Sequence, residues 1–324
     1  MKKIFQMVGL PRPAIACLLG LVWLQGYAQV VDNEKQASPY LVVLGISQDA
    51  GTPQAGTKEH RGWTDKKFRR LAASLGLIDP ATGQRWLFDA TPDFPEQLQH
   101  LDRLAPVAGK PGISGIFLTH AHMGHYTGLM FLGHESMGAK DVPVFAMPRM
   151  QKFLSANGPW SQLVKYRNIV ITELKDNECV RINNRLSVTP FSVPHRPEFS
   201  EVVGYRIDGP NRSAIFIPDI DSWEEWDRAG TLIEDMIASV DVAYLDGSFF
   251  ANGEIPGRDM SGFPHPFITH SMQRFSTLPV NEKKKIRFIH LNHTNRAIWP
   301  ASDERATVID NGFRIAGEGE IFEL

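Results

Sequence analysis

The sequence predicts an α/β protein built of stacked layers around one hydrophobic core. Short β-rich runs and helical stretches are mixed from residue 39 to the C-terminus, without the strict alternation of strand and helix that typifies an α/β barrel. Hydrophobic residues make up 43% of the 324 residues, which is enough for a sizeable core. No repeat or low-complexity linker divides this stretch. We therefore expect one domain over residues 39–324.

Nine segments are expected to be strands, because they are rich in Val, Ile and Phe and are bounded by turn residues. They are Tyr40–Ile46, Arg85–Asp89, Gly115–Thr119, Val142–Ala146, Arg185–Val193, Val202–Ile207, Ala214–Pro218, Val242–Leu245 and Ile286–Leu291. Five segments are expected to be helices, namely Pro95–Leu104, His125–His134, Arg149–Asn157, Ser222–Val240 and Thr269–Thr277. Ser222 is a typical N-cap, and two glutamates follow it in the first turn, where the helix dipole favours negative charge.

Residues 1–28 are expected to be a secretory signal peptide. Two lysines precede the apolar run Ala14–Leu24, which is shorter than the about 20 residues of a membrane-spanning helix. Small residues follow at the positions that signal peptidase reads, Gly26 and Ala28. The alternative is an uncleaved membrane anchor, whereas most of the apolar run follows Cys17, which argues against a lipoprotein. We expect an exported protein, periplasmic or extracellular, with a flexible lead-in at residues 29–38 and no stable membrane insertion after cleavage.

The charge balance narrows the expected partners. Lys and Arg number 34 against 36 Asp and Glu, so no basic excess points to nucleic acid. A small-molecule substrate is expected, and the sequence carries no signal for an oligomeric state. Cleavage would leave one cysteine, Cys179, which cannot form an internal disulfide and is expected to be a buried apolar residue.

A histidine cluster follows the expected strand at residues 115–119. His120 and His122 are two residues apart, so in extended chain their side chains point to the same side. His125 follows at the start of the next expected helix. Three imidazoles that converge within six residues are typical of a zinc or iron site. The alternative is a histidine-rich surface loop without ligands.

Three further candidates each follow an expected strand. They are His195, Asp219 and His293. Strand ends at one edge of a sheet gather residues that are distant in sequence into one cleft. Each residue alone has an ordinary structural interpretation as a loop histidine, a helix cap or a core residue, but together and in this order they favour a metal site.

The order His-x-His-x-x-His, His, Asp, His resembles the metallo-β-lactamase superfamily, whose fold is a four-layer αββα sandwich. The resemblance covers essentially the whole mature chain. It implies a first metal site formed by His120, His122 and His195, a bridging carboxylate at Asp219, and a second site served by His125 and His293. Asp89, which ends an early strand, is expected to orient the histidine loop through hydrogen bonds rather than to bind metal.

Several short motifs are similar to the branch of that superfamily formed by coenzyme PQQ synthesis protein B. They are the loop Asp49–Gln54 after the first expected strand, Asp89–Asp93, Leu245–Phe249, His265-Pro266 and His290–Asn295. They occur in the same order as in that branch.

One position departs from the superfamily pattern. The usual motif is His-x-His-x-Asp-His, and this chain has Gly124 where the aspartate belongs. Either the site holds one metal ion, or another carboxylate substitutes. Asp221 and Asp49 are the candidates, although a helix-flanking role and a turn role are the expected ones.

The resemblance implies a metal-dependent enzyme, and the export signal favours a hydrolase in which a metal-bound water attacks an ester, an amide or lactam, or a phosphodiester. One or two zinc ions are the expected cofactor, with iron or manganese as alternatives. Asp219 would complete or bridge the site, and His293, His265 or a carboxylate would protonate the leaving group. Two other classes stay open, namely an iron-dependent oxidoreductase like the PQQ branch and a non-catalytic metal-binding protein.

Overall fold

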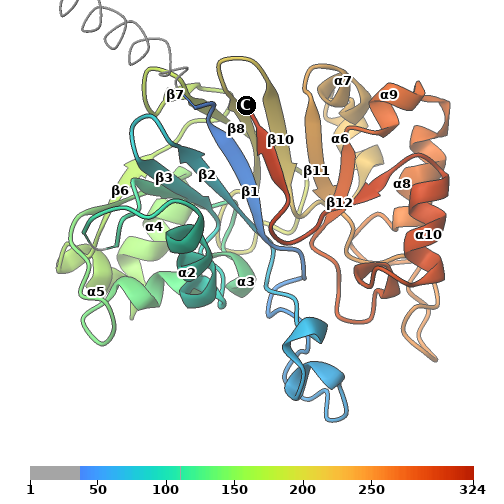
Figure 1. The fold of residues 1–324 in the computed structure, drawn as a ribbon, viewed down its shortest axis with the longest axis horizontal. Helices are drawn as coiled ribbons and strands as arrows, with labels where there is room; N and C mark the ends of the chain where they lie inside the picture. Colours follow the sequence, from blue (N-terminus) through green and yellow to red (C-terminus); the bar gives the residue numbers. More distant parts are fainter. Residues whose placement is uncertain (1–36, 110) are drawn as a thin grey trace, which may run out of the picture. The chain divides into compact units, whose positions relative to one another are not determined.

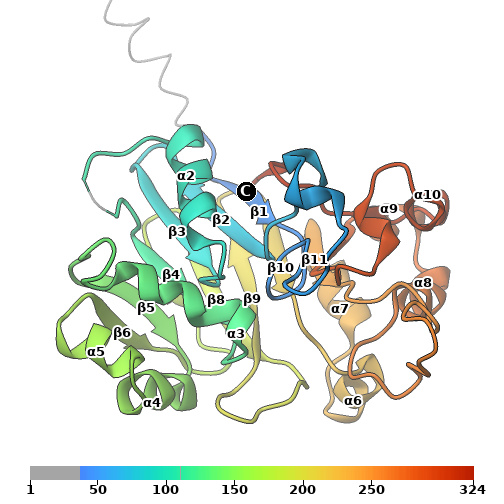
Figure 2. The ribbon, with the colours of Figure 1, turned by 90° about the horizontal axis from the view of Figure 1, so that it is seen from below.

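Two seven-stranded β-sheets stack face to face, and helices cover the outer face of each (Figure 1). The computed structural model describes residues 37–109 and 111–324, so the expected signal peptide and nearly all of the lead-in lie outside the described residues. Seen from below, α2–α5 and α6–α10 lie on opposite sides of the two sheets (Figure 2). The αββα sandwich expected from the resemblance is confirmed.

The first sheet has the strand order β14-β1-β2-β3-β4-β5-β6. Its strands are β1 (Tyr40–Gly45), β2 (Ser74–Asp79), β3 (Gln84–Phe88), β4 (Gly115–Phe117), β5 (Val142–Ala146), β6 (Ile169–Glu173) and β14 (Ile321–Glu323). The elements on its outer face are α2 (Phe94–Leu104), α3 (Met123–Tyr126), η3 (Thr127–Leu132), α4 (Pro148–Ala156) and α5 (Trp160–Lys165). β3 to β6 are parallel, so their C-terminal ends meet at one edge.

The second sheet has the order β13-β12-β11-β10-β9-β8-β7. Its strands are β7 (Val180–Arg181), β8 (Ser187–Ser192), β9 (Val203–Asp208), β10 (Ser213–Ile217), β11 (Val242–Asp246), β12 (Ile286–Ile289) and β13 (Arg314–Ile315). The helices on this side are α6 (Trp223–Arg228), α7 (Ile233–Ala238), α8 (Ile268–Arg274), η4 (Phe275–Thr277), α9 (Val280–Lys283), η5 (Arg296–Ile298) and α10 (Asp303–Asp310). β10 to β13 are parallel and also end together.

Aromatic side chains pack the two sheets against each other. Phe88 and Phe117 of the first sheet stack at 5.2 Å between ring centroids. Tyr205 of the second sheet lies 5.5 Å from Phe117, and Phe216 lies 6.2 Å from Phe88. All four are fully buried, so the alternation of inward and outward residues along these strands is satisfied by a shared core.

The nine expected strands are all present, with ends that differ by at most two residues. The long helix expected at Ser222–Val240 is instead two helices, α6 and α7, because Gly230 between them takes a φ of +92° that ends the first. Ser222 does cap α6, through its side chain to the amides of Glu224 and Glu225. Five further strands were not predicted, namely β2, β6, β7, β13 and β14.

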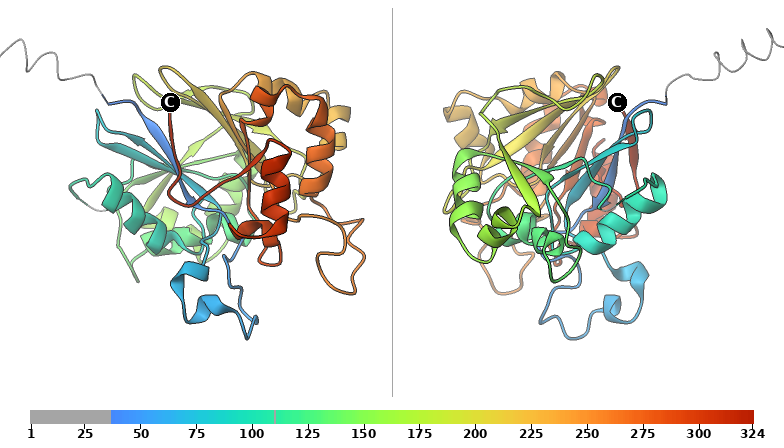
Figure 3. Two further views of the ribbon diagram at one scale, coloured as in Figure 1. Left: turned by 45° about the vertical axis from the view of Figure 1, so that its right-hand side comes forward. Right: turned by 90° about the vertical axis from the view of Figure 1, so that its left-hand side faces the viewer.

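The segment between β1 and β2, which contains η1 (Arg61–Trp63) and η2 (Lys66–Phe68), projects below the sheets (Figures 1 and 3). Cys179 is exposed, contrary to the expectation of burial, because it immediately precedes the two-residue edge strand β7. Among residues 37–109 and 111–324, none of the helices combines the length and the apolar character that crossing a membrane requires.

Candidate metal centre

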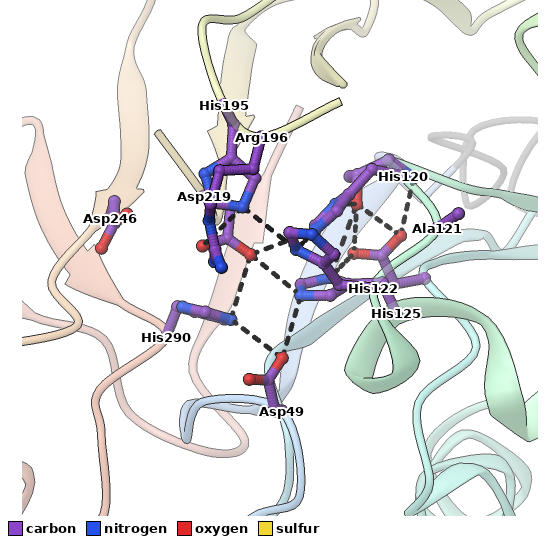
Figure 4. A network of polar contacts seen from close by, with 12 residues as sticks. Asp49, His120, Ala121, His122, His125, His195, Arg196, Asp219, Asp246 and His290 are labelled. Atoms are coloured by element: carbon purple, nitrogen blue, oxygen red, sulfur yellow. Dashed lines mark hydrogen bonds and ion pairs between the residues drawn. The ribbon is translucent and has the colours of Figure 1, made fainter. Parts of the chain in front are cut away.

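Three histidines and one aspartate meet where the strand ends of both sheets face each other. His120 and His122 follow β4, His195 follows β8 and Asp219 follows β10 (Figure 4). Nδ1 of His122 lies 2.9 Å from Nε2 of His120 and 3.1 Å from Nε2 of His195. Oδ2 of Asp219 lies 3.4 Å from Nε2 of His120, and its Oδ1 lies 3.8 Å from Nε2 of His195. We call these four residues group 1.

A second group of three residues lies beside the first and faces the same Asp219 (Figure 4). It contains Asp49 from the loop after β1, His125 from α3, and His290 directly after β12. Oδ2 of Asp219 lies 3.0 Å from Nε2 of His125 and 3.4 Å from Nε2 of His290. Oδ1 of Asp49 lies 3.6 Å from Nε2 of His125 and 4.0 Å from Nε2 of His290. We call Asp49, His125 and His290 group 2.

The histidines of both groups are held by hydrogen bonds through the ring nitrogen that faces away from the centre. Nδ1 of His195 bonds to Asp221 at 2.6 Å, and Nδ1 of His290 bonds to the Ser248 hydroxyl at 3.0 Å. The remaining contacts are Thr119 to Nδ1 of His120 at 2.9 Å, Asp89 to Nδ1 of His125 at 2.7 Å and Glu198 to Nε2 of His122 at 3.1 Å. Such partners fix the tautomer and the direction of a metal ligand.

Asp89 organises the histidine loop, as expected from the sequence. It is fully buried and accepts hydrogen bonds from the Thr119 amide at 2.8 Å and from the Thr119 hydroxyl at 3.0 Å, in addition to the bond from His125. Asp89 adopts a φ of +66°, and Asp49 and His290 adopt +40° and +64°. A positive φ in a residue other than glycine costs about 1–3 kcal/mol and clusters at functional sites.

The charges of the centre suit a cation. Burial lowers the pKa of His120 well below its usual value and also lowers the pKa values of His122 and His290. Burial would lower the pKa of His125 too, but Asp89, Asp219 and Asp49 outweigh it and raise that pKa well above its usual value. Burial would raise the pKa of Asp219, but the surrounding histidines, His290 first, hold it well below its usual range. Neutral imidazoles around an ionised carboxylate form a ligand set for Zn²⁺ or a similar metal ion.

Atoms without hydrogen bonds test whether the residues fit a metal ion. Nε2 of His125, Nε2 of His290 and Oδ1 of Asp219 are buried and have no hydrogen-bond partner in the described chain. Leaving a buried polar atom unpaired costs about 1–3 kcal/mol. Tetrahedral bonds of about 2.0–2.1 Å separate two ligand atoms by about 3.3–3.4 Å, and the distances in group 1 run from 2.9 to 3.8 Å. The residues present therefore fit a bound metal.

His265 and Asp246 form a buried pair next to Asp219. Nδ1 of His265 lies 2.8 Å from Oδ2 of Asp246 and 3.5 Å from Oδ1 of Asp219. Burial works against the charge of His265, but Asp246 outweighs it and raises the pKa to about 9. His265 and Asp221 both line a cavity of about 410 Å³. A larger cavity of about 630 Å³ is lined neither by His265 nor by Asp221, so we associate the smaller cavity with the centre through these two residues, which contact Asp219 and His195.

The structure brings together five of the six ligands expected from the sequence, but not His293. His290 takes that place, because β12 ends at Ile289 and the next side chain points into the centre, whereas His293 lies one turn further on. Nδ1 of His293 is buried without a hydrogen bond, and the ring belongs to none of the ligand groups among the described residues. His290 therefore replaces His293 as the candidate ligand of the second position. Of the two histidines offered from the sequence as proton donors, His265 is the one that lies beside Asp219.

The two carboxylates considered as substitutes for the missing aspartate have different positions. Asp221 bonds to the outer nitrogen of His195, and is therefore an orienting residue. Asp49 lies in group 2, contrary to the expectation of an ordinary turn residue. The pairing of Asp246 with His265, and Ser248 beside His290, were also missed, although Leu245-Asp246-Gly247-Ser248 ends an expected strand in the same way as the predicted ligands.

The chain is similar to known proteins over most of its length. Residues 84–298 match the beta-lactamase superfamily domain. Coenzyme PQQ synthesis protein B of Xanthomonas oryzae pv. oryzae is 26% identical over 86% of this chain and 98% of its own length. The corresponding protein of Pseudomonas putida is 24% identical over 88% of this chain and 100% of its own.

Two solved structures share the fold. Zn²⁺-bound PqqB from Methylobacterium extorquens superposes with a TM-score of 0.71 at 22% identity, over 88% of this chain and 100% of that one. A diphosphatase of the PhnP family superposes with a TM-score of 0.62 at 22% identity, over 89% and 98%. With the sandwich fold, the ordered ligand groups and the matched domain together, the chain belongs to the metallo-β-lactamase superfamily and resembles its coenzyme PQQ synthesis protein B branch.

Proposed function

We propose that this protein is a metal-dependent hydrolase that cleaves an ester, an amide or lactam, or a phosphodiester. The observation that carries the proposal is the pair of adjacent ligand groups that meet at Asp219, with a protonatable His265 beside them. A hydrolase needs both parts, a place to bind and activate water and a donor for the departing group. A non-catalytic metal site needs no such donor.

A divalent cation held by groups 1 and 2 would polarise a substrate oxygen and acidify water. The residues of the chain would divide the other tasks. Asp219 would link the two groups, and Asp221, Asp89 and Ser248 would keep the imidazoles in the required tautomer. Nδ1 of His265 donates to Asp246, which leaves Nε2 to carry the proton for the leaving group.

The substrate is expected to bind in the cavity of about 410 Å³ that His265 and Asp221 line. Its lining includes the aromatic rings of Phe263 and Phe267 and the carboxylates of Glu224 and Glu225. Such a lining favours a small molecule with an apolar part over a polyanion, because exposed carboxylates repel phosphate chains.

The test is a substrate panel with the metal-loaded protein. We expect zinc or manganese to support cleavage of a generic p-nitrophenyl ester, a chromogenic β-lactam or bis-p-nitrophenyl phosphate, and His122→Ala to abolish it. His265→Gln should lower kcat by about 10²–10⁴-fold, with a smaller change in KM, and the loss should shrink for substrates with good leaving groups. Absence of cleavage across the panel with stoichiometric metal bound would overturn the proposal.

The second candidate is an iron-dependent oxidoreductase. Two histidines with carboxylates, as in group 2, also suit iron, and the relatives named above are PQQ synthesis proteins. This candidate predicts oxygen consumption with iron and inactivity with zinc. Oxygen-electrode measurements on iron-loaded and zinc-loaded protein distinguish it from the hydrolase.

We further propose that the protein is exported after cleavage behind Ala28. The support is the N-terminal pattern of two lysines, a short apolar run and small residues at the cleavage position. N-terminal sequencing of protein from the periplasmic fraction should begin at Gln29. Cytoplasmic protein that still begins at Met1 would contradict the proposal.

A further inference from the structure

The carboxylate that the histidine motif lacks has a counterpart elsewhere in the chain. A Cβ atom placed on Gly124 would lie 2.4 Å from Oδ1 and 2.4 Å from Cα of Asp49. The space that a side chain at position 124 would need is thus filled by Asp49. Asp49 precedes residues 84–298, the part that matches the superfamily domain, so this group comes from a segment outside that match.

We propose that Asp49 supplies the carboxylate that position 124 lacks. It would be a ligand of a second metal ion, together with His125, His290 and Asp219. Glycine at position 124 is the counterpart, because a residue with a side chain would displace the Asp49 backbone. The inference rests on the proposed function only in that it requires a bound cation, and not on the reaction.

The atoms around this position point to an ion rather than to a hydrogen-bonded cluster. Nε2 of His125 and Nε2 of His290 are buried and make no hydrogen bond in the described chain, although a carboxylate oxygen of Asp49 lies 3.6 and 4.0 Å away. These distances are too long for hydrogen bonds and suit two ligands of one ion with bonds of about 2.0–2.2 Å. The ligand atoms of the three residues lie within 4.8 Å of one another.

The backbone holds the Asp49 loop in place from both sides. The amide of Gln48 donates to the carbonyl of Leu291 at 2.8 Å, and the amide of Leu291 donates to the carbonyl of Ile46 at 2.8 Å. The segment before Asp49 is therefore paired with the segment that follows His290. The hydroxyls of Ser47 and Thr52 close the loop with a hydrogen bond of 2.6 Å. A ligand carried by a loop that is anchored in this way keeps its position without a neighbour in the motif.

Charge is consistent with the assignment. Group 2 together with Asp219 offers two imidazoles, which bind metal in their neutral form, and two carboxylates. The two negative charges of the carboxylates balance a divalent cation. Without Asp49, Asp219 would be the sole carboxylate of the second position while it also serves group 1. The Asp49 side chain is 45% exposed, so this ligand also connects the second position to solvent.

Metal stoichiometry tests this role of Asp49 without reference to turnover. Full-length protein is stripped with chelator, reloaded with Zn²⁺ or Co²⁺, and measured by elemental analysis and by titration. Wild-type protein should bind two equivalents. Asp49→Asn, which keeps the size of the side chain and tolerates a positive φ, should retain one and weaken the second at least about 100-fold. The control is Glu59→Ala, which deletes an exposed carboxylate in the same loop between β1 and β2. This variant should retain both metal equivalents.

Two further variants test whether Asp49 takes the place of a side chain at position 124. Gly124→Ala should also lose the second equivalent, since the added Cβ displaces the Asp49 loop, and should keep the first. The double change Asp49→Gly with Gly124→Asp should restore part of the second binding, because the carboxylate returns to the motif. The inference would be overturned if Asp49→Asn bound two metal equivalents with unchanged affinity. It would also be overturned if the wild-type protein bound only one. Metal binding as expected without any hydrolysis would overturn the proposed function instead.

Discussion

Two replacements of Asp89 should have different effects on the free energy of unfolding and on the number of metal ions that the protein binds. In the wild type this buried carboxylate accepts bonds from the Thr119 amide, the Thr119 hydroxyl and Nδ1 of His125, at 2.8, 3.0 and 2.7 Å. Asp89→Ala removes all three acceptors and leaves three buried donors. Asp89→Asn keeps an oxygen for Thr119 but presents an amide to His125.

The expected magnitudes follow from these contacts. Breaking a buried, charged pair by removal of one partner costs about 3–5 kcal/mol. Alanine at a φ of +66° adds about 1–2 kcal/mol, because the left-handed region disfavours a Cβ. Asp89→Ala should therefore lower the free energy of unfolding by about 4–7 kcal/mol, a large part of the typical 5–15 kcal/mol. Asp89→Asn loses one acceptor and should cost about 1–3 kcal/mol.

The asparagine variant should also lose one metal equivalent while it stays folded. Its amide donates to Nδ1 of His125, so the ring proton moves to Nε2, which faces the centre and then cannot bind a cation. Urea unfolding of metal-free protein and metal titration measure the two effects separately. A loss of less than 1 kcal/mol in Asp89→Ala, or two equivalents with wild-type affinity in Asp89→Asn, would refute this account of Asp89.

Three other predictions concern the ions, the ligands and the core. Chelation should lower the Tm by about 5–9 °C relative to protein with free metal at about 1,000 times its Kd, since such binding stabilises by about 4 kcal/mol. An unchanged thermal transition by calorimetry would contradict bound metal. His290→Ala should lose one metal equivalent and His293→Ala none, by elemental analysis, and the reverse result would restore the expectation from sequence. Phe117→Ala, which empties a site between two stacked rings at 5.2 and 4.3 Å, should cost about 3–5 kcal/mol by urea unfolding with metal stoichiometry unchanged; a smaller cost would mean that the sheets close over the gap.

The sequence predicted those residues of the centre that directly follow a recognisable strand. His120, His122 and His125 follow one strand within six residues, and strand ends pointed to His195 and Asp219. The same rule selected His293, because His290 lay inside the expected strand Ile286–Leu291, so the choice depended on where that strand ends. β12 ends at Ile289, earlier than the expected Leu291, because the amide of Leu291 pairs with Ile46 of the other sheet.

The position of Asp49 was not predictable in this way. Its place depends on pairing between residues 48 and 291, which no local pattern announces. The glycine where a carboxylate was expected identified the missing chemistry, and Asp221 and Asp49 were both candidates for its source, but no local pattern chose between them. Conformations such as the positive φ of Asp49 and His290 are likewise imposed by tertiary contacts rather than by residue preference.

The ligand groups are drawn from both sheets. Asp49, His120, His122 and His125 follow strands of the first sheet, while His195, Asp219 and His290 follow strands of the second. A bound ion would therefore act as a cross-link between the two halves of the sandwich at one end only, while the aromatic core joins them along their length. On chelation, amide hydrogen exchange should quicken in the loops that carry these seven residues and stay slow in the strands behind them.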